Sequence, residues 1–390
     1  MRKIFTIFST LLLSVISFAQ QTDTSSLTNT CSLRISLLTC SPGTELYSTF
    51  GHTAIRITDA TSSTDIIYNY GTFNFDDPDF YTKFTRGKLL YFVSEETVPD
   101  FLYQYQYEQR SVTEQVLALS CEQKQQLYAA LQENAKEEHK YYKYDFVYDN
   151  CTTRLRDLIL KYAGTGSVTK NIRPYEGVTF RDLIHEYLNK SQQYWSKLGI
   201  DIVLGSPLDK KITNTEAQFL PDYFLKGLDS TSVNGQRLIE EKKIILPAAS
   251  VISSKPFFTP FVVFSLLFLL IAALSFIRAA QPALAIFDSF LFFICGLLGL
   301  LLLFMWFGTD HLTTKNNFNL IWAFPGHIIA AFALFKKRKW LRKYFIANNI
   351  VLILFIAFWK ALPQEINTDL FPLVALLLFR SIVRLFKQSL

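Results

Sequence analysis

The sequence predicts an α+β domain followed by an all-α membrane domain of about five helices. Three observations carry this prediction. Short runs between residues 32 and 71 alternate apolar and polar side chains, which is typical of strands. Residues 120–140 and 151–162 show the wider apolar spacing of helices. Beyond residue 256 the chain is almost continuously apolar, so that hydrophobic residues make up 50% of the whole sequence.

Residues 1–19 are expected to be an export signal. A short basic start precedes an apolar core, and Ala19 closes a small-residue cleavage site. An uncleaved anchor helix is the alternative, but the apolar run is shorter than the ~20 residues that a membrane span requires. No cysteine lies at the cleavage point, so the protein itself is not expected to be a lipoprotein. Export would place residues 20–245 outside the cytoplasm as one catalytic domain.

A short linker, residues 246–256, leads into the predicted membrane domain, residues 257–390. Its five apolar segments comprise residues 257–277, 284–307, 319–335, 344–361 and 370–386. The loop over residues 336–343 carries six basic residues among eight, and the positive-inside rule places it in the cytoplasm. The exported domain and the loops after the second and fourth segments then share the outer side. Because this loop largely explains the net charge of +6, no nucleic-acid binding is expected.

A histidine opens one of the predicted strands. His52 begins a run that alternates up to Thr58, a turn follows, and a second strand runs up to Gly71. An antiparallel hairpin centred near residues 61–62 places Tyr70 or Gly71 opposite His52, with Asn69 close by. We therefore expect Asn69 to orient the imidazole. A plain turn residue at the end of the strand is the alternative for Asn69.

A cysteine lies at the start of a predicted helix. Cys151 follows two possible N-cap residues, Asp149 and Asn150, and Gly164 comes just past the end of the helical pattern. A helix N-terminus lowers the pKa of a thiol and can hold an oxyanion. A nearby histidine supplies the base that such a nucleophile needs. We therefore predict catalysis by Cys151, His52 and Asn69.

The other cysteines bear on this prediction. Export would place Cys31, Cys40, Cys121 and Cys151 in an oxidising compartment, where two disulfides are possible. A structural disulfide is therefore the alternative role for Cys151. If Cys151 stays free, at most one bridge remains, and Cys31–Cys40 is the simplest candidate because both flank one strand-like run. The sequence alone does not fix the pairing.

The polar loop after the second apolar segment faces the same compartment as Cys151. It contains Asp310 and His311, which suit a second catalytic pair, a head-group site or a docking surface for the exported domain. An ordinary hydrophilic turn is the alternative. No metal-ligand spacing and no nucleotide-binding loop occur in the sequence, so neither a metal nor a cofactor is expected.

Two resemblances narrow these hypotheses. The order of a histidine strand before a cysteine helix resembles the circularly permuted papain-like fold of the NlpC/P60 superfamily. Four runs together resemble the Bacteroidota lipoprotein N-acyltransferase family, formerly a domain of unknown function. These runs are residues 38–43, 50–56, 68–73 and 144–154. The segment Thr309-Asp310-His311, with Asn317 and Asn319, resembles that family's motif in the membrane half.

The second resemblance implies an activity. Members of that family move an acyl chain from a phospholipid to the N-terminal amine of a diacylglyceryl-apolipoprotein. The chain would then be a multi-pass protein of the bacterial inner membrane with its catalytic domain in the periplasm. Its partners would be the phospholipid donor, the apolipoprotein acceptor and the membrane. The expected substrate-binding residues are Asn150, Arg154, Tyr70, Asp310 and His311.

Two other classes of function remain open at the level of the sequence. The same thiol chemistry fits a membrane-anchored NlpC/P60-like peptidase or amidase, or a phospholipase that passes the acyl group to water. A non-catalytic membrane binding or assembly protein, with Cys151 in a disulfide, is the second alternative. Each of the enzymes requires a free, alkylatable Cys151 thiol, whereas the non-catalytic protein would hold Cys151 in a disulfide.

Overall fold

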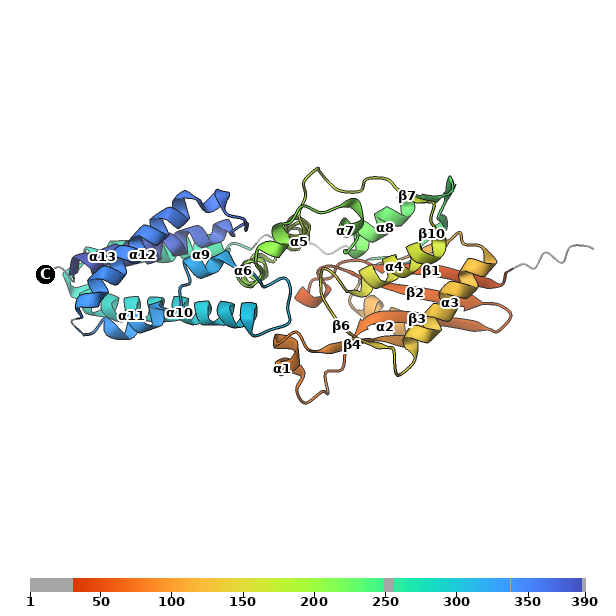
Figure 1. Cartoon of the computed structure of the whole chain (residues 1–390), viewed down its shortest axis with the longest axis horizontal. Coiled ribbons are helices and arrows are strands. Elements are labelled where there is room, and N and C mark those ends of the chain that lie inside the picture. The colour runs from red at the N-terminus through yellow and green to blue at the C-terminus, as the bar shows by residue number, and fades with distance from the viewer. Residues whose placement is uncertain (1–30, 249–255, 337, 388–390) are drawn as a thin grey trace, which may run out of the picture.

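The computed structural model describes residues 31–248, 256–336 and 338–387. The chain forms an α+β domain with an antiparallel sheet and, beyond it, a bundle of helices (Figure 1). The two lie end to end in an elongated molecule. The predicted export signal, residues 1–19, lies outside the described residues.

Seven strands form the main sheet, in the order β10-β5-β1-β2-β3-β4-β6, and each neighbouring pair is antiparallel. The strands are β1 (Leu33–Cys40), β2 (His52–Asp59), β3 (Thr64–Thr72), β4 (Leu90–Thr97), β5 (Val112–Leu117), β6 (Tyr141–Lys143) and β10 (Ile239–Leu246). The pairing of β2 with β3 runs from Asp59 opposite Thr64 to Ile55 opposite Tyr68. This register confirms the predicted hairpin. Continued by three residues, it brings His52 level with Gly71.

Helices cover both faces of the sheet (Figure 1). The buried residues Ile55 and Ile57 of β2 face α3 and α4, whose own apolar stripe includes Leu155 and Ile159. The opposite face meets α2, which buries Phe101. This two-sided burial follows from strands that are apolar on both faces. The helices are α2 (Val98–Tyr107), α3 (Cys121–Ala135) and α4 (Cys151–Ala163).

Smaller elements complete the exported part. Helix α1 stands apart from the sheet, beside the end of the membrane bundle (Figure 1). Helices α5 to α8 and a three-stranded sheet, β7-β8-β9, follow α4. These elements are α1 (Phe80–Thr85), α5 (Phe180–Lys190), α6 (Tyr194–Val203), α7 (Asn214–Ala217), α8 (Pro221–Ser230), β7 (Ser167–Thr169), β8 (Thr231–Val233) and β9 (Gln236–Arg237).

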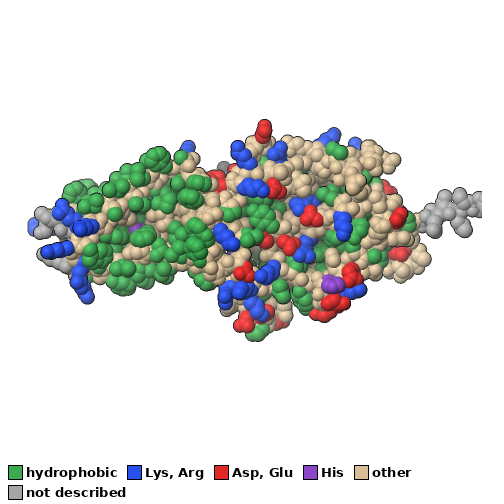
Figure 2. Space-filling model, in the orientation of Figure 1, with side chains coloured by type: hydrophobic (Ala, Val, Ile, Leu, Met, Phe, Trp, Pro, Cys, Tyr) green, Lys and Arg blue, Asp and Glu red, His purple; other side chains and the backbone are tan. Residues whose placement is uncertain are grey.

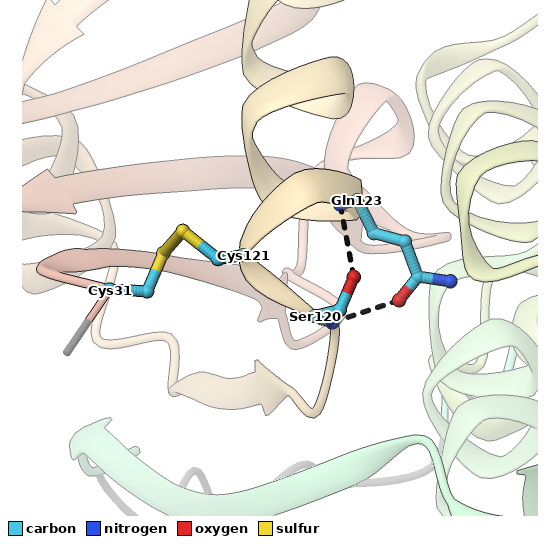
Figure 3. Close-up of a disulfide and its surroundings, with 4 residues drawn as sticks. All are labelled: Cys31, Ser120, Cys121 and Gln123. Atoms are coloured by element: carbon cyan, nitrogen blue, oxygen red, sulfur yellow. Dashed lines mark hydrogen bonds between the residues drawn. A yellow bond between two sulfur atoms is a disulfide. The ribbon is translucent and has the colours of Figure 1, made fainter. Parts of the chain in front are cut away.

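A disulfide joins Cys31 to Cys121 (Figure 3). It fixes the chain ahead of β1 to the start of α3, where Ser120 and Gln123 form a capping box. The predicted pair Cys31–Cys40 is wrong, and Cys40 is free and buried. The two residues lie at opposite ends of an extended strand, roughly 30 Å apart at about 3.3 Å per residue. A disulfide needs Cα atoms far closer, and they are 5.5 Å apart in the observed pair.

The helical part contains α9 (Pro260–Ser275), α10 (Gln281–Phe307), α11 (His327–Ala333), α12 (Lys339–Ala357) and α13 (Phe371–Lys387). Two helical stretches, Arg278–Phe307 and Lys339–Ala357, are long and apolar enough to cross a membrane, and α9 is shorter. Hydrophobic side chains cover the bundle, and basic side chains gather at its end remote from the sheet (Figure 2). This distribution agrees with the predicted orientation.

The third apolar segment differs from the prediction. Residues 319–335 do not form one continuous helix, because a short 3-10 turn over Phe318–Ile321 is followed by a bend and then by α11. Pro325 lies in the bend, and proline lacks the N–H that a helix interior requires. The seven residues of α11 extend only about 10 Å at 1.5 Å per residue. The helix α11 alone is therefore too short to cross a bilayer.

Side chains from the loops of the bundle hold the exported part. Asn319 donates to the main-chain carbonyl of Asp201 (3.0 Å), and Asn367 donates to the Asp201 carboxylate (2.8 Å). Asn317 and Gln364 likewise donate to main-chain carbonyls at the end of α6. All four amide side chains are buried. Two of them, Asn317 and Asn319, belong to the motif in the membrane half. In this structure these two asparagines join the bundle to the exported part.

Candidate active site

His52 and Cys151 meet over a glycine. A Cβ atom on Gly71 would lie 3.5 Å from Cys151 Cβ and 3.9 Å from His52 Cε1. Gly71 has a φ of +94°, which side chains rarely tolerate. The two distances are ordinary van der Waals separations, so His52 of β2 and Cys151, the first residue of α4, both lie against Gly71, and the positive φ is what favours glycine here. The register of the β2–β3 hairpin and the start of α4 bring together the two residues that the sequence singled out.

Asn150 is the N-cap of α4. Its Oδ1 accepts from the N–H groups of Thr152 and Thr153 at 2.8 Å each, and Thr153 Oγ1 accepts from the Asn150 N–H at 2.8 Å. Its Nδ2 donates to the carbonyls of Phe146 and Phe219. The whole amide is therefore taken by the protein, which leaves nothing for the predicted contact with substrate. The cap leaves the N–H of Cys151 itself without a partner in the described part of the chain.

Asn69 makes a hydrogen bond to His52, and Glu96, which the sequence analysis did not single out, makes a hydrogen bond to Asn69. The oxygen Oδ1 of Asn69 lies 2.6 Å from His52 Nε2, and its Nδ2 donates to Glu96 Oε1 at 2.8 Å. Because a carboxylate only accepts, Glu96 fixes the amide so that its oxygen faces the imidazole. Nε2 therefore carries a proton, and Nδ1 is the ring nitrogen left for Cys151. Ser94 also donates to Glu96 (2.8 Å), which fixes the carboxylate in turn.

The imidazole and the thiol shift each other's pKa. Burial opposes ionisation of the Cys151 thiol, but the charge of His52 and its hydrogen bond outweigh burial and lower the pKa of Cys151. Burial also disfavours the charged form of His52, yet the Cys151 thiolate and the bond to Asn69 leave the pKa of His52 raised. The two shifts favour a thiolate–imidazolium pair. The thiolate is the nucleophilic form of cysteine.

Tyrosines form a wall beside this pair. The rings of Tyr91 and Tyr144 stack with centroids 4.4 Å apart, and Tyr144 also lies against Gly71. The Arg154 guanidinium lies 3.5 Å from the centroid of the Tyr142 ring. These aromatic residues were not predicted, although the short run at residues 141–144 is rich in tyrosine and precedes the cysteine closely.

The predicted substrate-binding residues Arg154 and Tyr70 lie near the cysteine but have protein partners. Arg154 makes a two-point ion pair with Asp149, at 2.6 and 2.8 Å. Tyr70 is fully buried, and its hydroxyl accepts from Asn134 (2.8 Å). Arg154 is partly exposed, so a substrate can still reach it, whereas Tyr70 contributes to packing.

Asp310 and His311, which follow the second apolar segment, each contact residues of the exported part. The carboxylate of Asp310 pairs with Lys143 at 3.0 Å, and the main-chain N–H of Asp310 donates to the carbonyl of Arg86. His311 Nε2 donates to the carbonyl of Phe84 (3.1 Å). These contacts fit the docking surface, which was one of the roles left open by the sequence. No group of three or more His, Cys, Asp or Glu side chains suited to a metal occurs in the described ranges.

Comparison with known families gives two matches. The model of the Lnb N-terminal periplasmic domain matches residues 20–192, and that of the Lnb transmembrane domain matches residues 252–389. No curated protein and no solved structure gives a significant match. The two matches follow the order of the α+β domain and the bundle and together cover most of the chain. The chain therefore belongs to the Lnb family, with a periplasmic N-terminal domain ahead of a transmembrane domain.

Proposed function

We propose that this protein is a lipoprotein N-acyltransferase of the bacterial inner membrane. It transfers an acyl chain from a phospholipid to the N-terminal amine of a diacylglyceryl-cysteine lipoprotein. The observation that carries the proposal is the contact of His52 with Cys151 at the start of α4, in a chain of the Lnb family. We assign the exported domain, residues 20–245, to the circularly permuted papain-like class on its order of histidine strand and cysteine helix.

The first half of the reaction loads the enzyme. His52 Nδ1 takes the proton of Cys151, and the thiolate attacks an ester carbonyl of the phospholipid. The N–H of Cys151 stabilises the negative oxygen of the tetrahedral intermediate. When the ester C–O bond breaks, the imidazolium returns its proton to the leaving oxygen. The products are a thioester on Cys151 and a lysophospholipid.

The second half passes the acyl group on. The neutral α-amine of the lipoprotein attacks the thioester carbonyl, and His52 accepts a proton from the amine nitrogen. The C–S bond breaks, the thiolate is restored beside the imidazolium, and an amide is formed. Both substrates lie in the membrane leaflet that faces the exported domain, so anchoring brings them close to the thiol.

Two observations oppose the non-catalytic alternative. Cys151 is free, since Cys31 and Cys121 form the disulfide. The pKa of Cys151 is lowered, whereas burial raises the pKa of Cys40, the free thiol at the end of β1, to about 12. A thiolate beside a histidine suits a nucleophile better than a packing residue. Hydrolysis remains as the competitor, either of the same thioester by water or of a peptide or amide bond by the same thiol.

The thioester itself provides the test. Purified full-length protein is mixed with phospholipid in the absence of an acceptor, and its cysteine peptides are analysed by mass spectrometry. We expect one acyl group on the Cys151 peptide, released by neutral hydroxylamine, with the Cys40 peptide unmodified as the internal control. Release of lysophospholipid without any acyl group on Cys151 would contradict the proposed mechanism.

A further inference from the structure

A segment beside the bundle exposes aromatic side chains to solvent. Residues 73–90, which we call the arm, include α1 and project beside the end of the membrane helices (Figure 1). Its exposed fractions are 71% for Phe75, 80% for Tyr81 and 52% for Phe84. These three exposed aromatic rings lie within ten residues of one another. Aromatic side chains are enriched where a protein meets the head groups of a membrane.

The arm is tied to the loop that follows α10. The main-chain carbonyls of Phe84 and Arg86 accept hydrogen bonds from His311 and Asp310, which follow the outer end of α10. That helix ends at Phe307, whose side chain is 73% exposed. The arm is therefore tied to the point at which a membrane helix leaves the bilayer, and it extends sideways from the bundle.

Positive charge gathers where the arm meets the sheet. Lys143, Lys88 and Arg86 surround Asp310 and lower the pKa of its carboxyl group. Only Lys143 makes an ion pair with Asp310, and within the described ranges Arg86 and Lys88 pair with no carboxylate. Three cations around one carboxylate leave a net positive charge. The phosphate diester of a phospholipid is an anion available at this height above the bilayer.

A cavity of about 520 Å³ opens beside these cations. Phe73, Leu90, Phe92 and Tyr141 give it apolar walls. Its polar lining consists of Asn74, of Asp77 and Lys83, which pair with each other at 2.7 Å, and of Lys88, which has no carboxylate partner among the described residues. The rings continue inward towards the nucleophile. Phe73 contacts Tyr91 (centroids 5.2 Å apart), Tyr91 stacks on Tyr144, and Tyr144 lies against Gly71 beside Cys151.

We propose that the arm is a membrane-surface element that binds an outer-leaflet phospholipid. Phe75, Tyr81 and Phe84 enter the interfacial region of the bilayer, and Arg86 and Lys88 bind the phosphate group of the lipid. The cavity and the row of aromatic rings then lead from this lipid to Cys151. That last step rests on the proposed function, because it treats the bound lipid as the acyl donor. The binding of lipid by the arm does not depend on catalysis.

The depth of the arm is tested without turnover. Full-length Cys151→Ala protein carrying Tyr81→Cys is labelled with an environment-sensitive fluorophore and placed in nanodiscs of phosphatidylcholine and phosphatidylglycerol. The matched control carries Ser62→Cys in the exposed turn between β2 and β3, at the far end of the sheet (Figure 1). Cys40 and Cys295 are buried and do not compete for label. We expect spin-labelled lipids to quench the label at position 81 and not that at position 62. Equal access of both labels to an aqueous quencher would overturn the proposal.

The phosphate site is tested by crosslinking. A phosphatidylglycerol analogue with a photoreactive head group should label the arm of the Cys151→Ala protein, and Arg86→Glu with Lys88→Glu should lower the yield several-fold. Arg237→Glu, on the exposed strand β9, reverses one charge away from the arm and should leave the yield unchanged. Equal yields in all variants would overturn the phosphate site.

The test of whether the arm supplies the donor phospholipid requires the active enzyme. In protein with Cys151 intact, the reversal of Arg86 and Lys88 should raise the apparent KM for phospholipid about tenfold with little change in kcat. An unchanged KM, together with reduced crosslinking, would show that the arm binds lipid without supplying the donor. If acyl transfer failed in every variant while the label at position 81 stayed in the bilayer, the proposed function would be contradicted. The proposal that the arm is a membrane-surface element would still hold.

Discussion

Thr53 and Thr152, the residues that follow the candidate base and nucleophile, share a hydrogen bond of 3.0 Å between their hydroxyl oxygens. Both side chains are buried, so the bond is protected from water. It joins β2 directly to the first turn of α4, and the Thr53 N–H also contributes to lowering the pKa of Cys151. The positions of His52 and Cys151 are therefore set by rigid elements rather than by loops.

We expect Glu96 to act as a positioning residue for His52. In Glu96→Ala the Asn69 amide is free to turn its Nδ2 towards the imidazole, which disfavours the tautomer that accepts the thiol proton. Acyl transfer should fall roughly tenfold to a hundredfold. The alkaline limb of the pH–rate profile should also move to lower pH, because Asn69 no longer stabilises the imidazolium. The exposed neighbour Glu95→Ala is the matched control. Equal effects of the two substitutions would contradict this role.

The shifted pKa of Cys151 predicts a particular pH dependence of alkylation. A lowered pKa keeps the thiol ionised below its ordinary range, so iodoacetamide should modify Cys151 at a lower pH than an ordinary cysteine, and the rate should fall as the pH falls through the lowered pKa. His52→Ala removes the partner charge and should move the whole profile to higher pH. Peptide mass spectrometry gives the rates, and Cys40, with its raised pKa, should stay unmodified. An identical profile in His52→Ala would argue against the ion pair.

The Cys31–Cys121 disulfide should stabilise the exported part. It closes a chain segment with a sequence separation of 90, and its removal by Cys31→Ser with Cys121→Ser should cost about 2–4 kcal/mol of unfolding free energy. Thermal unfolding of the full-length protein in detergent measures the loss, and Cys40→Ser provides the comparison with a thiol outside any bridge. Activity at low temperature should survive, because the disulfide lies outside the candidate site. An unchanged midpoint would contradict a stabilising role.

A buried ion cluster should be essential to the bundle. Asp288 of α10 pairs with Arg380 and Arg384 of α13, and Asp288 and Arg380 are fully buried. Asp288→Ala leaves two arginines unpaired in an apolar surrounding, which should cost about 3–5 kcal/mol. Size-exclusion chromatography after graded heating detects the loss, and Asp288→Asn, which keeps the shape, should be less harmful. Heat resistance equal to that of the unaltered protein would rule out this role for the cluster.

The local parts of the site followed from the sequence because they depend on neighbours in the chain. The hairpin register places His52 near Asn69, and the cap at Asn150 places Cys151 at a helix start. Glu96 was missed because its contact with Asn69 depends on the pairing of β3 with β4, which no local pattern fixes. The partner of Cys31 was missed for the same reason, since Cys121 lies on a helix that reaches it only through the folded sheet.

In the membrane half, too, local features were predicted and contacts between distant residues were missed. The apolar segments and their orientation are encoded in composition and loop charge, but the break in the third segment depends on how Pro325 and its neighbours pack against α10. A Cβ atom on Gly299 of α10 would lie 2.9 Å from Pro325, so the bend fits closely against that helix. The contacts of Asp310 and His311 with the arm likewise join residues more than two hundred positions apart.

The central claim is that Cys151 passes an acyl chain from phospholipid to a lipoprotein amine. Its most direct test expresses the protein in a diderm bacterium depleted of its own apolipoprotein N-acyltransferase and measures the N-terminal peptide of a reporter lipoprotein by mass spectrometry. We predict one additional acyl chain on that peptide with the unaltered protein and none with Cys151→Ala. An unmodified amine, despite correct insertion and a free Cys151 thiol, would contradict the claim and favour hydrolysis.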